Sequence, residues 1–84
     1  MSKTTKDEQF LLKLYDLAKD EGDFDLEINY LKFGKEMIYK DKITKTIVRD
    51  LLQANFVKKI DSDTIQLTQN GITFAQKHKE GWVS

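Results

Sequence analysis

The apolar residues of this chain recur with two different periods, and the order of those periods limits the folds that it can adopt. Helical spacing predicts helices over residues 6–21, 30–39, 42–54 and 69–80. Alternating or short apolar runs predict strands over residues 23–29, 56–60 and 64–67. With 84 residues, the chain has the size of one domain. We therefore expect a single α+β domain over residues 1–84, ordered helix, strand, helix, helix, strand, strand, helix, with a small antiparallel sheet and with residues 1–5 disordered.

Residues that favour helix ends stand at the expected boundaries. Thr5 and Glu8 have the spacing of a capping box at the start of the first helix, and Gly22 suits a left-handed C-terminal cap. Further expected caps are Asn29, Asp41 and Thr68 at helix N-termini and Asn55 at a C-terminus.

Several segments present one apolar face that we expect to form the core. The face of the third helix consists of Ile43, Ile47, Val48 and Leu51. That of the second helix consists of Leu31, Gly34, Met37 and Ile38. The missing side chain of Gly34 suits a close helix crossing, although glycine weakens a helix by about 1 kcal/mol relative to alanine. On the first strand, Phe24, Leu26 and Ile28 should point inward, and the intervening acidic residues should protect a sheet edge.

The composition excludes several kinds of site. The chain has no cysteine, so disulfides and thiolate metal sites are excluded. The acidic residues over 20–27 lack the spacing of an EF-hand calcium loop, and His78, the single histidine, has no recognisable catalytic partner. No apolar run is long enough to span a membrane, and the N-terminus lacks a signal-peptide pattern. We therefore expect a cytoplasmic binding module with no cofactor, no metal ion and no catalytic residues.

Charge is unevenly distributed along a chain whose formal net charge is zero. Residues 7–29 contain eight acidic residues and two lysines, whereas residues 35–60 contain seven basic residues and three acidic ones. Zero net charge argues against a protein that coats nucleic acid indiscriminately. A domain with this polarity can nevertheless present one basic face to an anionic partner.

Several segments match, in order, the features of one protein superfamily. Residues 31–52 comprise two predicted helices joined by a short polar turn, as in a helix-turn-helix. Asn55-Phe56-Val57 stands where that superfamily usually has Gly-Leu-Ile, and Leu67-Thr68-Gln69-Asn70-Gly71 is similar to its frequent Leu-Thr-x-x-Gly. Over residues 6–80, the chain resembles the winged helix-turn-helix superfamily, and in particular the small standalone winged-helix proteins of bacteria and their phages.

The resemblance implies binding of double-stranded DNA, with the helix over residues 42–54 in the major groove, and a role as a small transcriptional regulator. Winged helices also serve as protein-interaction modules, so an accessory factor of a phage or its host that does not bind DNA is the alternative. Two positions depart from the family pattern, because Asn55 replaces glycine and the expected wing tip, Asp61-Ser62-Asp63, is acidic. The acidic tip disfavours a contact between the wing and phosphate.

The outer face of the helix over residues 42–54 is the strongest candidate site. With about 100° between successive residues, its polar side chains form one stripe. This stripe consists of Lys42, Lys45, Thr46, Arg49 and Gln53. Lysine and arginine neutralise phosphates, and arginine and glutamine bind the edges of guanine and adenine. Lys35 on the second helix and Lys59 on the wing are further candidates for DNA contact. The alternative interpretations are a protein contact through the same face and an ordinary solvated helix face.

A second candidate surface is apolar. Leu12 falls off the apolar stripe of the first helix, Tyr15 borders that stripe, and Trp82 follows the last helix. If the fold gathers these side chains, they form a patch suited to a homodimer or to another protein partner. Helix-turn-helix proteins often pair to match two half-sites, so a homodimer and a monomer are equally open at this point.

Overall fold

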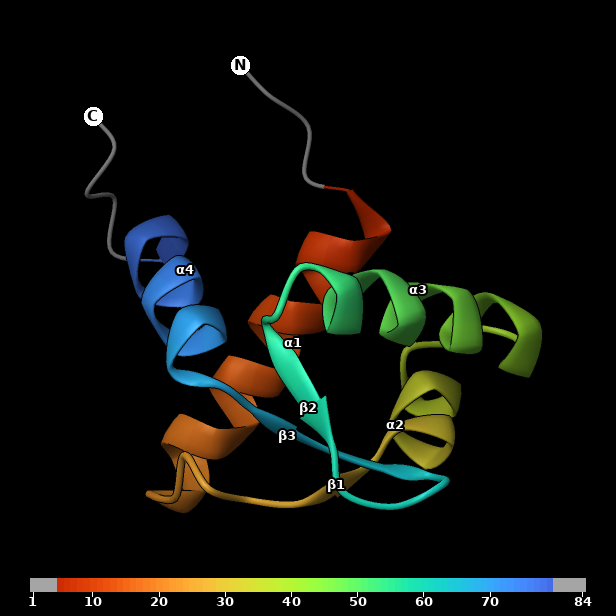
Figure 1. Ribbon diagram of the computed structural model, residues 1–84, viewed down its shortest axis with the longest axis horizontal. Coiled ribbons are helices and arrows are strands. Elements are labelled where there is room, and N and C mark those ends of the chain that lie inside the picture. The colour runs from red at the N-terminus through yellow and green to blue at the C-terminus, as the bar shows by residue number, and fades with distance from the viewer. Residues whose placement is uncertain (1–4, 80–84) are drawn as a thin grey trace.

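The computed structural model describes residues 5–79, which form helices and strands in the expected order (Figure 1). The elements are α1 (Lys6–Glu21), β1 (Ile28–Asn29), α2 (Tyr30–Glu36), α3 (Asp41–Gln53), β2 (Val57–Lys59), β3 (Thr64–Leu67) and α4 (Gln69–Lys79). The prediction of an α+β fold with four helices and a small antiparallel sheet is thus confirmed for the described part of the chain.

The three strands form one antiparallel sheet in the order β1-β3-β2. Ile28 pairs with Ile65, and Val57 pairs with Leu67. The first strand is an edge strand, as expected, but it is limited to two residues, so the prediction of a strand over residues 23–29 is wrong for most of that segment. The backbone turns at the start of this segment instead, because the Asp23 carboxylate accepts a hydrogen bond from the Asp25 amide at 2.9 Å.

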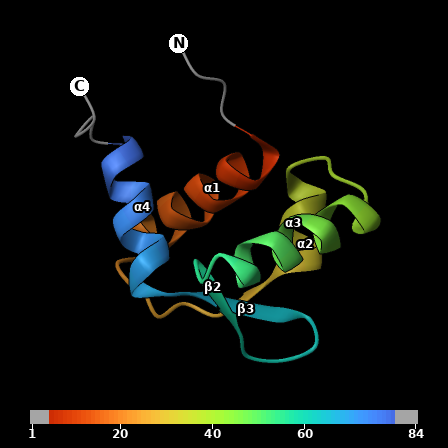
Figure 2. The same ribbon diagram turned by 45° about the horizontal axis from the view of Figure 1, so that its top comes forward.

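The helices surround a core to which both helices and strands contribute side chains. In both ribbon views α1 lies between α3 and α4, with the sheet along one side of the molecule (Figures 1 and 2). Phe10 and Leu11 of α1 and Ile65 of the central strand β3 have no exposed surface, so both elements contribute fully buried side chains to the core. The remaining members of the buried cluster are Leu14, Ala18, Ile28, Tyr30, Ile47, Val48, Leu51, Val57 and Leu67.

Most of the predicted caps are confirmed. Thr5 and Glu8 form the capping box of α1, so Thr5 does not belong to a disordered end as the range 1–5 implied. Gly22 is left-handed, and the Asn29 side chain accepts a hydrogen bond from the Lys32 amide at 3.0 Å. The prediction for Asp41 is wrong, because Asp41 is the first residue of α3 and its N-cap, Lys40, makes no side-chain cap hydrogen bond.

The second helix ends three residues before the predicted boundary, and Ile38 reverses the chain after it. The Tyr39 amide donates to the Gly34 carbonyl at 2.9 Å, and the Ile38 amide donates to the Lys35 carbonyl at 3.0 Å. This pair of hydrogen bonds is a Schellman motif, which requires a left-handed residue at position 38. Ile38 has a φ of 63° and is 92% exposed, so the expectation that it points into the core is wrong. The left-handed conformation costs a residue with a side chain about 1–2 kcal/mol.

Gly34 permits the close contact of α2 with α3, as the sequence predicts. A Cβ atom at this position would overlap the Thr44 hydroxyl and lie 2.7 Å from its Cγ2 atom. Thr44 is completely buried, although its residue type gave no reason to place it in the core. Its Oγ1 atom has no hydrogen-bond partner among the described residues, so this contact is held by packing alone.

The Leu-Thr-x-x-Gly segment joins the start of α4 to the end of α3. The Thr68 hydroxyl donates to the Asn55 carbonyl at 2.6 Å and accepts from the Gly71 amide at 3.1 Å. A Cβ atom on Gly71 would overlap the Phe56 carbonyl oxygen, so only glycine allows this approach. Asn55 is left-handed with a φ of 64°, as expected. The motif therefore has a structural role in this chain.

Candidate nucleic-acid interface

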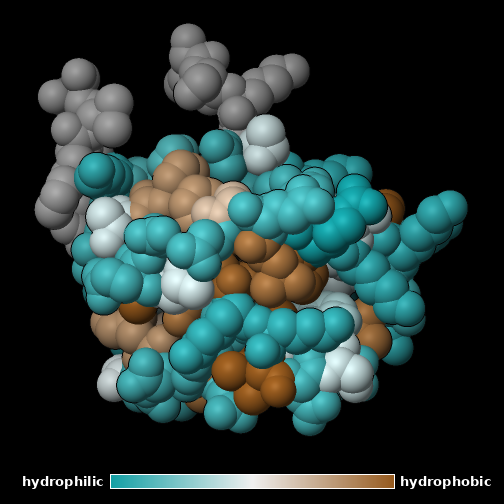
Figure 3. All heavy atoms as spheres, viewed as in Figure 1, coloured by the Kyte–Doolittle hydropathy of each residue, from teal (hydrophilic) through white to brown (hydrophobic). Residues whose placement is uncertain are grey.

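The polar stripe on α3 is exposed along its whole length. The exposed residues are Lys42, Lys45, Thr46, Arg49 and Gln53. The opposite face of the same helix is buried, with Thr44, Ile47, Val48 and Leu51 against the rest of the fold. Because this burial fixes the rotation of α3 about its axis, it also fixes the outward direction of the stripe. Figure 3 shows hydrophilic side chains over this helix.

The charges on the stripe are available to a partner. The Arg49 Nη2 atom lies 3.6 Å from the Oδ1 atom of its neighbour Asp50, but the Arg49 side chain is 66% exposed. Exposed ion pairs of this kind contribute little to stability, so the pair does not hold Arg49 back from a partner. Among the interactions of the described residues, no ion pair involves Lys42 or Lys45. The Thr46 hydroxyl donates to the Lys42 carbonyl at 3.1 Å, which leaves its oxygen lone pairs free to accept.

The lysines proposed to flank the stripe are also exposed. Lys35 lies in the last turn of α2, the helix that precedes α3 in the chain. Lys59 is the last residue of β2 and lies on the same face of that strand as the buried Val57. Lys58 points to the other face, so the two adjacent lysines cannot both serve one contact surface.

The β2–β3 hairpin does not project freely from the molecule, because its tip is tied to α2. The Tyr30 amide donates to the Asp63 carbonyl at 2.9 Å, and the Tyr30 hydroxyl donates to the Ser62 carbonyl at 2.7 Å. Asp61 and Asp63 remain exposed at this tip. Sequence reasoning missed Tyr30, since no local pattern connects residues that are 32 positions apart.

The predicted apolar patch does not form as expected. Tyr15 is only 2% exposed and stacks on Phe24, with ring centroids 5.5 Å apart, so its place in a surface patch is wrong. Leu12 is half-buried and lines a surface hollow with Met37 and Lys79. Trp82 lies outside the described residues. Leu12 is therefore the single described member of that patch with accessible surface.

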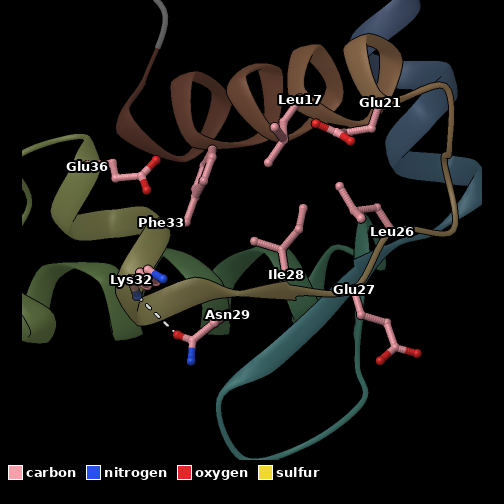
Figure 4. Close-up of a pocket in the computed structure, with 9 residues that line it drawn as sticks. All are labelled: Leu17, Glu21, Leu26, Glu27, Ile28, Asn29, Lys32, Phe33 and Glu36. Atoms are coloured by element: carbon pink, nitrogen blue, oxygen red, sulfur yellow. Dashed lines mark hydrogen bonds between the residues drawn. The ribbon is translucent and has the colours of Figure 1, made fainter.

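A shallow groove of about 360 Å³ lies between α1, α2 and the segment that leads into β1 (Figure 4). Leu17, Leu26 and Phe33 point toward one another across it and are half-buried. Glu21 and Glu36 stand at its rim. None of the lining residues belongs to α3, so the groove and the basic stripe are separate surfaces.

A pair of carboxylates lies where α1 meets the flank of α3. Partial burial raises the pKa of Asp7, and the charge and hydrogen bonding of Asp50 raise it further, with a smaller contribution from Glu8. The His78 ring lies tilted against the Phe74 ring, with centroids 4.6 Å apart. Within residues 5–79, no three histidine or acidic side chains converge in an arrangement that could hold a metal ion.

The chain was compared with known protein families, curated proteins and solved structures. No protein family, no curated protein and no solved structure matches it. No helix among the described residues is long and apolar enough to cross a membrane.

Proposed function

We propose that this chain is a winged helix-turn-helix protein that binds double-stranded DNA through the outer face of α3, as a small transcriptional regulator. One observation supports this most strongly. A basic stripe is exposed on a helix whose opposite face is buried, so side chains suited to DNA project from a rigid support. In the proposed arrangement, α2 and α3 are the two helices of the motif, and β2 and β3 form its wing.

Each side chain of the stripe has a role that follows from its chemistry. Lys42 and Lys45 neutralise phosphates on the groove edges, since ammonium groups act as flexible point charges. Arg49 and Gln53 have the donors and acceptors needed to bind guanine and adenine edges in the major groove. Lys35 and Lys59 add phosphate contacts beside the helix. The acidic, tethered hairpin tip contributes nothing to phosphate binding, so recognition depends on α3.

The test is a charge reversal on the stripe. Lys45→Glu with Arg49→Glu should abolish binding of duplex DNA at low salt and leave the fold intact, because both positions are exposed. The matched control is Lys13→Glu with Lys19→Glu, which makes the same charge change at exposed positions of α1. The control should retain most of the wild-type affinity. A folded stripe variant that binds as well as the wild type would exclude DNA binding through α3.

Single substitutions then separate the roles within the stripe. Lys45→Ala should weaken binding to all sequences alike and reduce the slope of log affinity against log salt by about one. Arg49→Ala should cost about 1–3 kcal/mol at a preferred site and less on random DNA. Neither change should alter the free energy of unfolding by more than about 0.5 kcal/mol, since both side chains face solvent.

A protein-interaction module is the second candidate function, and the groove beside α1 favours it. Half-buried apolar side chains with glutamates at the rim suit a cationic, apolar segment of a protein partner. Titration of the wild-type protein with duplex DNA distinguishes the two functions. If the wild type binds no duplex DNA at low salt, the groove becomes the leading site, and Leu26→Lys should then abolish binding of such a segment.

A further inference from the structure

The turn between α2 and α3 contains a residue that is poorly suited to its backbone conformation. Ile38 has a φ of 63°, a region where β-branched side chains are strongly disfavoured. Among the described residues, Asn55 is the other non-glycine residue in this region, with a φ of 64°, and asparagine tolerates the left-handed conformation. The two residues stand at opposite ends of α3 and share a backbone conformation. They differ in how well their side chains tolerate that conformation, and the poorly suited side chain is that of Ile38.

Nothing within the described fold offsets the strain at Ile38. The hydrogen bonds of the turn are made by the backbone amides of Ile38 and Tyr39, so glycine would make them equally well. The Ile38 side chain is 92% exposed, which means that it gains almost no stability from burial. A costly side chain that gains so little inside the protein suggests a contact outside it.

The position of Ile38 indicates the kind of contact. It lies three residues before Asp41, where α3 begins, and the exposed side chains of Lys40 and Lys42 follow it closely. When a helix lies along the major groove, residues at its N-terminal end also reach base edges, beside those that Arg49 and Gln53 are proposed to bind further along it. The exposed charged residues near Ile38 in the chain are Lys35, Lys40 and Lys42, together with Glu36 and Asp41. Under the proposed binding of duplex DNA, the partner carries phosphates, and Ile38 needs an apolar group on it. Thymine in duplex DNA presents such a group, its 5-methyl, in the major groove.

We propose that Ile38 is a specificity-determining residue that contacts the 5-methyl group of thymine in the bound duplex. This inference rests on the proposed DNA binding by α3 and adds a base preference to it. It also gives a reason for an isoleucine at a position where glycine would form a more stable turn.

The experiment compares two variants that remove the apolar side chain and still fit a left-handed backbone, Ile38→Gly and Ile38→Asn. A preferred site is first selected from random duplexes with the wild-type protein. Both variants should bind that site about fivefold more weakly, which corresponds to the loss of one small apolar contact. The salt slope should not change, because no charge is removed. Thermal unfolding of Ile38→Gly should occur at a temperature at least as high as that of the wild type.

Asn55→Gly is the matched control at the other left-handed position. It relaxes the same backbone conformation at the opposite end of α3 and should leave affinity for the selected site unchanged. If Ile38→Gly binds the selected site as tightly as the wild type does, the proposal for Ile38 is wrong, and DNA binding by α3 still stands.

A second arm removes the methyl group from the DNA. Replacing the thymines of the selected site by uracil should weaken wild-type binding about fivefold and have little effect on Ile38→Gly. Equal losses in both proteins would overturn the assignment to thymine. If the wild-type protein binds no duplex DNA at low salt, the proposed function fails, and the inference about Ile38 fails with it.

Discussion

The two faces of α3 differ in what their side chains contact. On the inner face, Thr44, Ile47 and Leu51 are between 0% and 3% exposed and pack against α1, α2 and β2. On the outer face, Lys45 and Arg49 are exposed, and within residues 5–79 neither forms an ion pair with another element. Stability should therefore depend on the inner face, and recognition should depend on the outer one. The comparison can be tested by substitutions whose effects on unfolding should fall steeply from one face to the other.

The largest effect is expected at the centre of the inner face. Ile47→Asp places a carboxylate in a site that is 2% exposed, within a core whose described buried members are apolar except for Thr44. The free energy of unfolding should fall by more than about 4 kcal/mol, a large part of the total stability of a domain of this size. Chemical denaturation measures the loss, and Ile47→Val is the control, with an expected cost of about 0.5–1.5 kcal/mol. Wild-type stability of Ile47→Asp would show that the inner face is wrongly assigned.

An intermediate effect is expected where α3 meets α2. In Gly34→Ala, the new methyl group meets all three heavy atoms of the Thr44 side chain, so the helices must separate. We expect a loss of about 1–3 kcal/mol despite the better helix propensity of alanine. Combining Gly34→Ala with Thr44→Ala should cost less than the sum of the two single changes, measured as a double-mutant cycle. The control is Lys35→Ala, at the exposed position next to Gly34, which should leave the free energy of unfolding almost unchanged. If the losses of Gly34→Ala and Thr44→Ala simply add in the double variant, the predicted contact between the two residues is contradicted.

The smallest effect is expected at Asp50, on the flank between the two faces. The pKa of Asp7 is raised in the folded protein, so the folded state holds its proton to higher pH than the unfolded state does. Stability therefore falls as pH rises through the window above 3.8, the ordinary value for this carboxyl. Asp50→Asn removes the second cause of the raised pKa and leaves partial burial, the first cause, in place.

Asp50→Asn should accordingly lower the pKa of Asp7 and make stability less dependent on pH in that window. The gain at neutral pH should be less than about 0.5 kcal/mol, because Asp7 is only partly buried and solvent screens its interaction with Asp50. An NMR titration of the Asp7 side-chain carboxyl carbon, in the wild type and in Asp50→Asn, measures the change. An unchanged pKa would show that the two carboxylates do not interact.

Much of this protein was predictable from the sequence, because the relevant interactions are local. Thr5 and Glu8 are three residues apart, and the capping box that they form needs nothing from the rest of the chain. The apolar stripe of α3 likewise predicts its buried face, and the exposure of Lys42, Lys45 and Arg49 follows from the same helical period. The predicted order of helices and strands is confirmed, because the type of each element follows from the periodicity and caps of its own segment.

The tertiary structure decided what depends on neighbours far along the chain. Tyr15 is buried because Phe24 packs on it, and Thr44 is buried because the missing side chain of Gly34 makes room for it. Ile38 is exposed because α2 ends early and the backbone turns outward there. The burial of a side chain depends on which surfaces meet, whereas periodicity within one segment reports only which side of that segment is apolar. For that reason the sequence determined the elements and their faces, and the assembled fold determined which individual side chains remain accessible to a partner.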